Sequence, residues 1–193
     1  MEARFEEEDF RGQNWRGREF EDANFRHALF GEAQLDGCRF IHCDFTGAQF
    51  GSACIVQSVF IGCEWQWAAF FAPELNRVSM IACTLDEADL RGVRIHQGDW
   101  LGSTLRYQNL SKYDFSGMKL QDTDFYGANL AHCKFQNADL SRAILAQANL
   151  THADLRGANA AGIDWTALKL SRTRLDSAQA SLLAQSYGAI IDG

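Results

Sequence analysis

Large apolar residues recur at every fifth position along almost the whole chain. Between residues 123 and 157 the sequence reads as seven quintets: TDFYG, ANLAH, CKFQN, ADLSR, AILAQ, ANLTH and ADLRG. The central residue of each, called i here, is large, i−2 is small, and i+2 is polar or Gly. Five residues turn an α-helix by about 140°, and a continuous strand would point alternate centres outward. The pattern therefore predicts short strands joined by corners, with four sides making a solenoid coil of about 20 residues.

The register of centres extends from Phe5 to Leu175 without an inserted residue. Of these 35 centres, 34 are large and apolar, 26 have a small residue at i−2, and 11 of the 16 glycines lie at i+2. Glycine at i+2 suits a corner with unusual backbone dihedral angles. We expect an all-β solenoid of 8–9 coils over residues 1–176, built around four apolar columns.

Two stretches depart from the pattern. The first turn places Glu8, Gln13 and Arg18 at i−2, where they either block the addition of a further strand or form a charged tip for a partner. Bulky or flexible residues occupy i−2 near residues 98–120, which predicts a bend there.

The quintets stop after Leu175, and the tail reads DSAQASLLAQSYGAIIDG. We expect a helix near 177–187, capped by Asp176 or Ser177 and ended by Gly188, followed by a short strand at 189–191. This segment, residues 177–193, either covers the last coil or joins two chains, and its apolar content favours a dimer. The expected interface consists of Leu182, Leu183, Tyr187, Ile190 and Ile191.

Cysteine usage and the first residues indicate a cytoplasmic protein. Five of the six cysteines lie at i−2 as small hydrophobic residues, and no Cys-x₂-Cys spacing occurs, so we expect neither disulfides nor a metal. The start, MEARFEEEDF, is acidic, and no apolar run is long enough to cross a membrane.

Nothing in the sequence indicates catalysis. The five histidines lie at i+1 or i+2, outside the core, and the chain has no phosphate-binding loop or nucleophile elbow. His132 and His152 share one ladder with Lys112 and Arg172, a basic column without evident metal ligands. We therefore expect no enzyme activity and no cofactor.

Most of the net charge of −7 falls on one side of the predicted solenoid. The side centred on residues 5, 25, 45 and onward carries eight acidic and three basic residues. Such a side repels nucleic acid and attracts proteins that have basic DNA grooves. The expected partner-binding residues are Asp44, Glu64, Asp86, Glu87, Asp124 and Asp164.

The repeat resembles the pentapeptide-repeat family, since ADLRG at 88–92 and 153–157 matches the family motif at every place. The resemblance implies a right-handed quadrilateral β-helix. Within that family the chain is similar to the MfpA, AlbG and Qnr group of DNA mimics. Similarity to this group implies a homodimer that binds DNA gyrase through acidic surfaces and counters gyrase poisons. Qnr proteins carry projecting loops that this register lacks, so the chain looks more like MfpA or AlbG, which favours immunity to a natural toxin.

A second hypothesis is a scaffold that binds another protein through an apolar surface. Its basis is an outward ladder at i+1, formed by Ile41, Ile61, Ile81 and Leu101, with Val56, Val59, Trp67 and Phe71 nearby. The alternative explanation is that β-branched residues simply stack well on a strand surface.

Overall fold

The computed structural model describes residues 3–191. Residues 1–2 of the expected solenoid (1–176) and residues 192–193 of the expected C-terminal segment (177–193) lie outside the described residues. The structure divides into two compact units, Met1–Thr104 and Leu105–Gly193, called the N-terminal unit and the C-terminal unit. This division falls within residues 98–120, where we expected a bend, and the bend itself stays a prediction. The expected boundary at residue 176, between the solenoid and the C-terminal segment, also stays a prediction.

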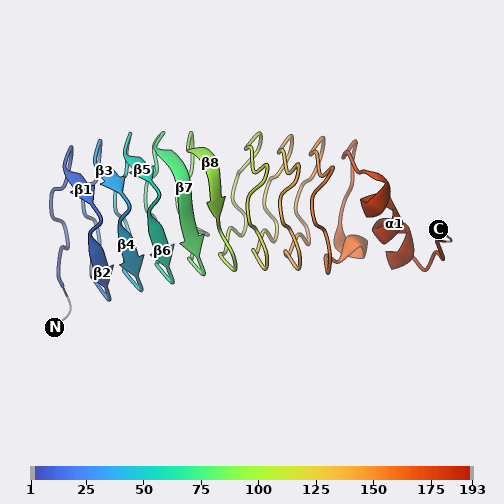
Figure 1. Cartoon of the computed structure of the whole chain (residues 1–193), viewed down its shortest axis with the longest axis horizontal. Coiled ribbons are helices and arrows are strands. Elements are labelled where there is room, and N and C mark those ends of the chain that lie inside the picture. Colours follow the sequence, from blue (N-terminus) through green and yellow to red (C-terminus); the bar gives the residue numbers. More distant parts are fainter. Residues whose placement is uncertain (1–2, 192–193) are drawn as a thin grey trace. The chain divides into compact units, whose positions relative to one another are not determined.

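The N-terminal unit is a parallel β-solenoid. Its short strands pair with strands 20 residues further along, so that Trp15 pairs with Leu35 and Leu35 with Ile55. The strand order is β1-β3-β5-β7-β6-β4-β2, with β8 paired to β7 (Figure 1). The strands are β1 (Asn14–Arg16), β2 (Glu19–Glu21), β3 (Gln34–Asp36), β4 (Arg39–Ile41), β5 (Cys54–Val56), β6 (Val59–Ile61), β7 (Glu74–Ile81) and β8 (Arg94–Asp99).

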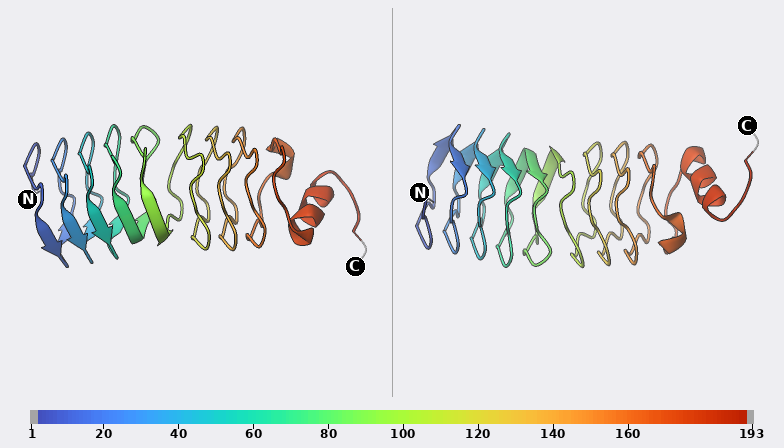
Figure 2. Two further views of the ribbon diagram at one scale, coloured as in Figure 1. Left: turned by 90° about the horizontal axis from the view of Figure 1, so that it is seen from above. Right: turned by 90° about the horizontal axis from the view of Figure 1, so that it is seen from below.

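Single-residue bridges form the remaining sides of the coils in both units. In the N-terminal unit they run from Arg4↔Asn24 to Thr84↔Thr104, always 20 residues apart. In the C-terminal unit an Asn ladder joins three coils: Asn129 Nδ2 donates to Asn109 Oδ1 at 3.0 Å, and Asn149 Nδ2 donates to Asn129 Oδ1 at 3.1 Å. Figure 2 shows the coils from two further sides. The predicted 20-residue coil is therefore confirmed in each unit.

The corners explain why the strands are short. Among residues 3–191, all 21 non-glycine residues with positive φ lie at i+2, as do all such glycines except Gly188. A left-handed conformation costs a non-glycine residue about 1–2 kcal/mol. Hydrogen bonds to the next coil offset this cost: the amide of His27, with φ 56°, donates to Thr46 O at 2.9 Å. Glycine is thus favourable at the corners but is not required there.

The predicted columns of large side chains form the core. Of the 35 centres, 29 are buried, and the partly buried ones are Phe5, Phe10, Phe20, Ile95, Leu170 and Leu175. In one column the rings of Phe25, Phe45 and Trp65 are nearly parallel, with centroids 5.0 and 4.4 Å apart. The five cysteines at i−2 are buried beside such columns, and burial raises the pKa of the Cys133 thiol to about 12.

The first coil is covered by its own polar side chains. Trp15 Nε1 donates to Gln13 Oε1 at 2.9 Å, and the Arg18 guanidinium lies 4.7 Å from the centre of the Trp15 ring. Glu8 is exposed. Gln13 and Arg18 therefore shield the core at this end, whereas a partner for a charged tip stays a prediction.

The C-terminal segment forms the expected helix, α1 (Ser177–Ser186), preceded by a 3₁₀ turn, η1 (Trp165–Ala167), that we did not predict. Asp176 is the N-cap and forms a capping box with Gln179. The strand expected at 189–191 is absent from this described stretch, because these residues pair with no other strand. No helix within residues 3–191 has the length and apolar character needed to span a bilayer.

Gln179 attaches α1 to the last coils. Its buried amide nitrogen donates to the carbonyls of Leu155 and Ala158, and Asp176 Oδ2 accepts from the Gly157 amide at 2.6 Å. These bonds satisfy backbone groups that the end of the solenoid leaves without a further coil.

Replacing Gln179 by Ala should therefore destabilise the protein. The change removes the side-chain donor from the buried Ala158 carbonyl, and the Leu155 carbonyl keeps only its bond from the Ala158 amide. We expect this loss to lower the free energy of unfolding by about 1–3 kcal/mol. Thermal unfolding followed by circular dichroism would measure this loss. Gln185→Ala on the exposed part of the same helix is the control, and equal effects of the two changes would contradict this role of Gln179.

Candidate functional site

The predicted acidic side is divided between the two units. In the N-terminal unit Asp44 and Glu64 form a direct parallel bridge, and Thr84, Asp86 and Glu87 follow on the same side one coil later. Asp124 and Asp164 belong to the C-terminal unit. The structure therefore brings Asp44 and Glu64 together, and we treat the residues of each unit as a separate group.

Several of these carboxylates already have partners. Arg26 Nη1 lies 3.0 Å from Asp44 Oδ2, and Arg106 Nη1 lies 3.4 Å from Asp124 Oδ2, where the Asp124 side chain is only 16% exposed. Glu64 instead accepts a neutral hydrogen bond from Gln66 Nε2 at 2.9 Å, and Glu87 is exposed. Glu64 and Glu87 thus present more accessible negative charge than Asp44 or Asp124.

The aspartates at i−1 also have a structural role that our sequence reasoning missed. At 14 positions within residues 3–191, an Asp or Asn Oδ1 at i−1 accepts a hydrogen bond from the backbone amide at i+1. Asp44, Asp124 and Asp164 are among them. These bonds are Asx turns, which hold the chain as it approaches each corner. The Asp or Asn at the second place of the repeat was the available signal.

The Asx bonds shift the titration of these groups. Burial raises the pKa of Asp44, but hydrogen bonds from Thr46 and Arg26 outweigh it and hold the pKa below its ordinary value. The Thr166 hydroxyl and amide lower the pKa of Asp164, which also caps η1. Both aspartates are therefore charged near neutral pH, but neither can be replaced by Lys without losing a backbone contact.

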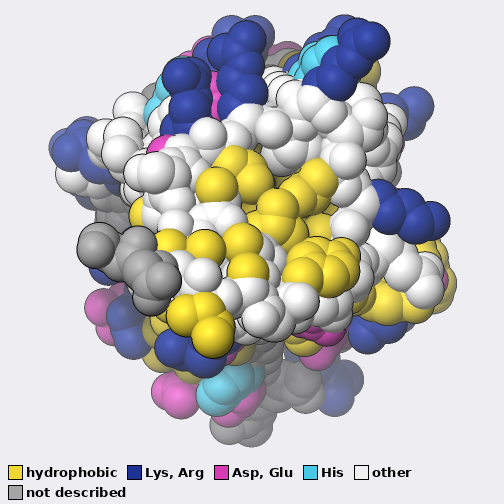
Figure 3. Space-filling model, turned by 90° about the vertical axis from the view of Figure 1, so that its right-hand side faces the viewer, with side chains coloured by type: hydrophobic (Ala, Val, Ile, Leu, Met, Phe, Trp, Pro, Cys, Tyr) yellow, Lys and Arg dark blue, Asp and Glu magenta, His cyan; other side chains and the backbone are white. Residues whose placement is uncertain are grey.

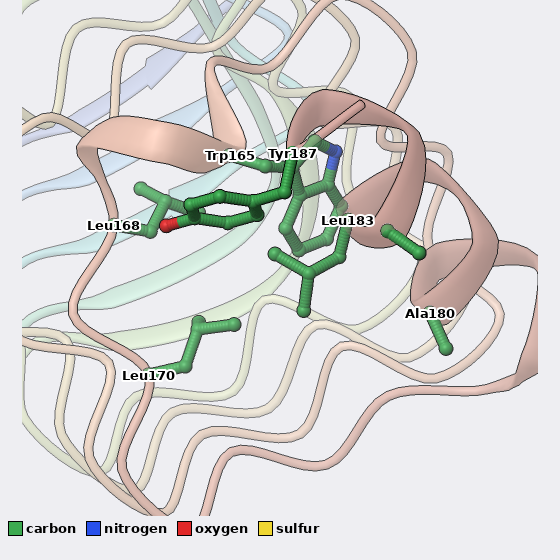
Figure 4. A pocket seen from close by; sticks show the side chains of 7 residues that line it. Trp165, Leu168, Leu170, Ala180, Leu183 and Tyr187 are labelled. Carbon is green, nitrogen blue, oxygen red and sulfur yellow. The ribbon is translucent and has the colours of Figure 1, made fainter. Parts of the chain in front are cut away.

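Two of the expected dimer residues, Leu183 and Tyr187, line an apolar hollow in the C-terminal unit. Leu168 and Leu170 come from the segment before α1, Leu183 comes from α1, and Tyr187 is the C-cap of that helix (Figure 4). Together with the buried Trp165 they line an open hollow of about 420 Å³. Figure 3 shows hydrophobic side chains gathered on the C-terminal end of this unit. The most exposed large residues here are Leu182 (37%), Tyr187 (69%), Ile190 (89%) and Ile191 (46%).

The outward apolar ladder exists in the N-terminal unit. Ile41 pairs with Ile61, and Ile61 pairs with Ile81, on neighbouring strands β4, β6 and β7. These three residues are half-buried by their neighbours, whereas Trp67 and Phe71 are 66% and 71% exposed. The three isoleucines offer little free apolar area, so the accessible apolar surface of this unit lies mainly at Trp67, Phe71 and Leu101, the last member of the ladder, which is 39% exposed.

The described residues offer no evident centre for metal chemistry. Within residues 3–191, no three His, Cys, Asp or Glu side chains come together as metal ligands would.

Comparisons with solved structures give similarities over most or all of the chain. A trypsin-treated variant of QnrB1, described as a plasmid-mediated fluoroquinolone resistance protein, is 26% identical, with a TM-score of 0.74 over 100% of this chain and 99% of that chain. Full-length QnrB1 is 24% identical, with a TM-score of 0.67 over 98% and 99%. HetL, a pentapeptide-repeat protein from the cyanobacterium Nostoc sp. strain PCC 7120, is 22% identical, with a TM-score of 0.70 over 90% and 77%. A comparison with curated proteins gave no match.

The family comparison agrees with the repeat. The model described as "Pentapeptide repeats" matches in eight copies over residues 3–40, 19–62, 102–137, 123–159 and 148–181, which together span more than half of the chain. The chain therefore belongs to the pentapeptide-repeat family.

Proposed function

We propose that this protein is a non-catalytic DNA mimic that binds DNA gyrase or a related type II topoisomerase and counters gyrase poisons. The observation that carries the proposal is the similarity to a fluoroquinolone resistance protein over the whole chain, at 26% identity. That similarity also supports the finer parts of the fold prediction, a right-handed quadrilateral β-helix of 8–9 coils. Its action would confer drug resistance or self-immunity in the cytoplasm.

The charge distribution supports this proposal and places the acidic surplus in one unit. Residues 1–104 contain 17 acidic and nine basic residues, whereas residues 105–193 contain eight and nine. Phosphates of duplex DNA form a line of regularly spaced charge, and proteins that hold DNA have basic grooves complementary to it. The N-terminal unit, with its Asp44–Glu64 bridge, is therefore the better mimic.

The test is direct binding to purified gyrase. We expect the immobilised protein to retain gyrase, the retention to weaken steeply as salt rises, and duplex DNA to compete. An assay of DNA supercoiling, with a quinolone in one arm and a peptide toxin in another, would identify the class of poison. Because the register has no inserted loop, we expect protection against the toxin to be the stronger. Failure to retain gyrase at low salt would exclude the proposal.

A scaffold function remains the second candidate because Trp67 and Phe71 are strongly exposed in the N-terminal unit. Large aromatic side chains are common anchors at protein interfaces. If this candidate is correct, Trp67→Asp will reduce partner capture while changes of acidic residues leave it unaffected.

A further inference from the structure

A basic hollow lies on the C-terminal unit, apart from the acidic and apolar surfaces described above. It encloses about 360 Å³ between two neighbouring ladders of side chains. One is the corner column predicted from the sequence, and the other is the bridge series Asp114↔Lys134↔Asp154↔Arg174. Its charged and imidazole-bearing residues are Lys134, Arg156, Arg172, Arg174, Asp154, His132 and His152.

The hollow has more cationic charge than its acidic residue can neutralise. Asp154, whose side chain is 10% exposed, is the acidic residue that lines it. This carboxylate is shared by Arg156 at 2.6 Å and Arg174 at 3.9 Å, and it also accepts from Gln136 at 2.9 Å. Arg172 has no ion pair within residues 3–191. Lys134 Nζ is paired with Asp114 Oδ2 at 3.1 Å, at the edge of the hollow. The remaining three guanidinium groups and the Asp154 carboxylate leave a charge of +2 in a concave site, on a chain whose net charge is −7.

Two stacked imidazole rings, those of His132 and His152, also line the hollow. The rings of His132 and His152 are nearly parallel, with centroids 4.8 Å apart and an interplanar angle of 11°. Both occupy corners with positive φ, and their amides donate to Thr151 O and Ser171 O at 2.9 Å, so the backbone fixes the spacing of the pair. Neutral rings stack favourably at this distance, whereas two imidazolium ions repel each other unless an anion lies beside them.

We propose that this hollow binds an oxyanion, specifically the phosphate group of a small phosphorylated ligand. Guanidinium groups match the oxygen geometry of phosphate. The phosphate would supply the missing negative charge, and Arg172 and Arg174 would donate charge-assisted hydrogen bonds to its oxygens. The volume suits one or two phosphate groups and a small attached moiety rather than a duplex backbone. The charged residues that line the hollow or continue its two ladders are Lys112, Asp114, Lys134, Asp154, Arg156, Arg172 and Arg174, and basic groups predominate among them.

Isothermal titration calorimetry on the full chain tests this proposal. The probes are inorganic phosphate, pyrophosphate and adenosine monophosphate, which separate a free anion from an esterified phosphate. We expect saturable binding of at least one probe, weakened about tenfold or more by Arg172→Gln with Arg174→Gln. Arg77→Gln with Arg94→Gln is the matched control, because these residues occupy i+2 and i−1 in the N-terminal unit, and Arg94 likewise has an acidic neighbour, Glu74.

Equal weakening by both arginine pairs would attribute binding to general charge and overturn the site. The absence of saturable binding by any probe, or binding of a duplex oligonucleotide alone, would overturn it as well.

Discussion

Reversing two glutamates of the N-terminal unit, Glu64→Lys with Glu87→Lys, should abolish the inhibition of gyrase supercoiling. Both side chains are accessible, and neither makes an Asx turn, so folding should be preserved. Each new Lys would face a basic groove, and juxtaposed like charges oppose association strongly. We expect binding to gyrase to weaken about 100-fold, as measured by calorimetry or by the concentration needed to inhibit supercoiling.

The matched control for this variant changes the same net charge on other sides of the same unit. Glu74 lies at i−1, like Glu64, and Glu32 lies at i+2, like Glu87. If Glu74→Lys with Glu32→Lys weakens gyrase binding equally, net charge and not a defined acidic side is responsible. If neither pair matters but Trp67→Asp does, the scaffold function replaces the DNA mimic. Circular dichroism of both variants should match the unmodified protein.

Glutamates are better probes than the aspartates first considered, for a structural reason. Asp124 and Asp164 accept hydrogen bonds from the amides of Tyr126 and Thr166, so Lys at these positions would disturb the local backbone. Asn at the same positions keeps an oxygen acceptor and removes only the charge. Charge patterning in the sequence could identify an acidic side, but it could not separate carboxylates used in turns from those free to bind a partner.

The second large effect expected is on assembly. The intact protein should scatter light as a dimer, with twice the 21.6 kDa chain mass, and Ile190→Asp with Ile191→Asp should give the single-chain mass. These side chains are 89% and 46% exposed, so the change leaves the solenoid core untouched. Placing charges in an apolar interface removes hydrophobic burial and adds desolvation, and we expect the dimer to weaken about 100-fold or more.

Leu101→Asp is the control for assembly, since Leu101 is 39% exposed but lies in the N-terminal unit. A single-chain mass for the unmodified protein at micromolar concentration would contradict a dimer. The apolar hollow around Leu183 and Tyr187 would then serve only to hold α1 on the last coil.

The repeat made most of the fold predictable. The five-residue spacing identified the coil, the buried columns and the corners because each depends on residues close in sequence and on one repeated geometry. The 3₁₀ turn at Trp165 was not predictable because the register of centres continues through it and gives no signal of a change. The missing strand at 189–191 lies beyond the repeat, where the sequence has no periodic signal. Gln179 was missed because its role depends on carbonyls of Leu155 and Ala158 some 20 residues earlier.

The Asx turns have a consequence for how such a protein evolves. Asp and Asn make the same hydrogen bond at i−1, and their codons differ by one nucleotide. Asn109, Asn129 and Asn149 hold their corners as Asp44 and Asp124 do, although only the aspartates carry charge. Single point mutations can therefore redistribute charge over the coils while the backbone hydrogen bonds stay in place. A few Asn-to-Asp substitutions that leave the fold unchanged can therefore turn an uncharged solenoid surface into one that resembles a polyanion. Selection by a toxin can act on each of these substitutions separately.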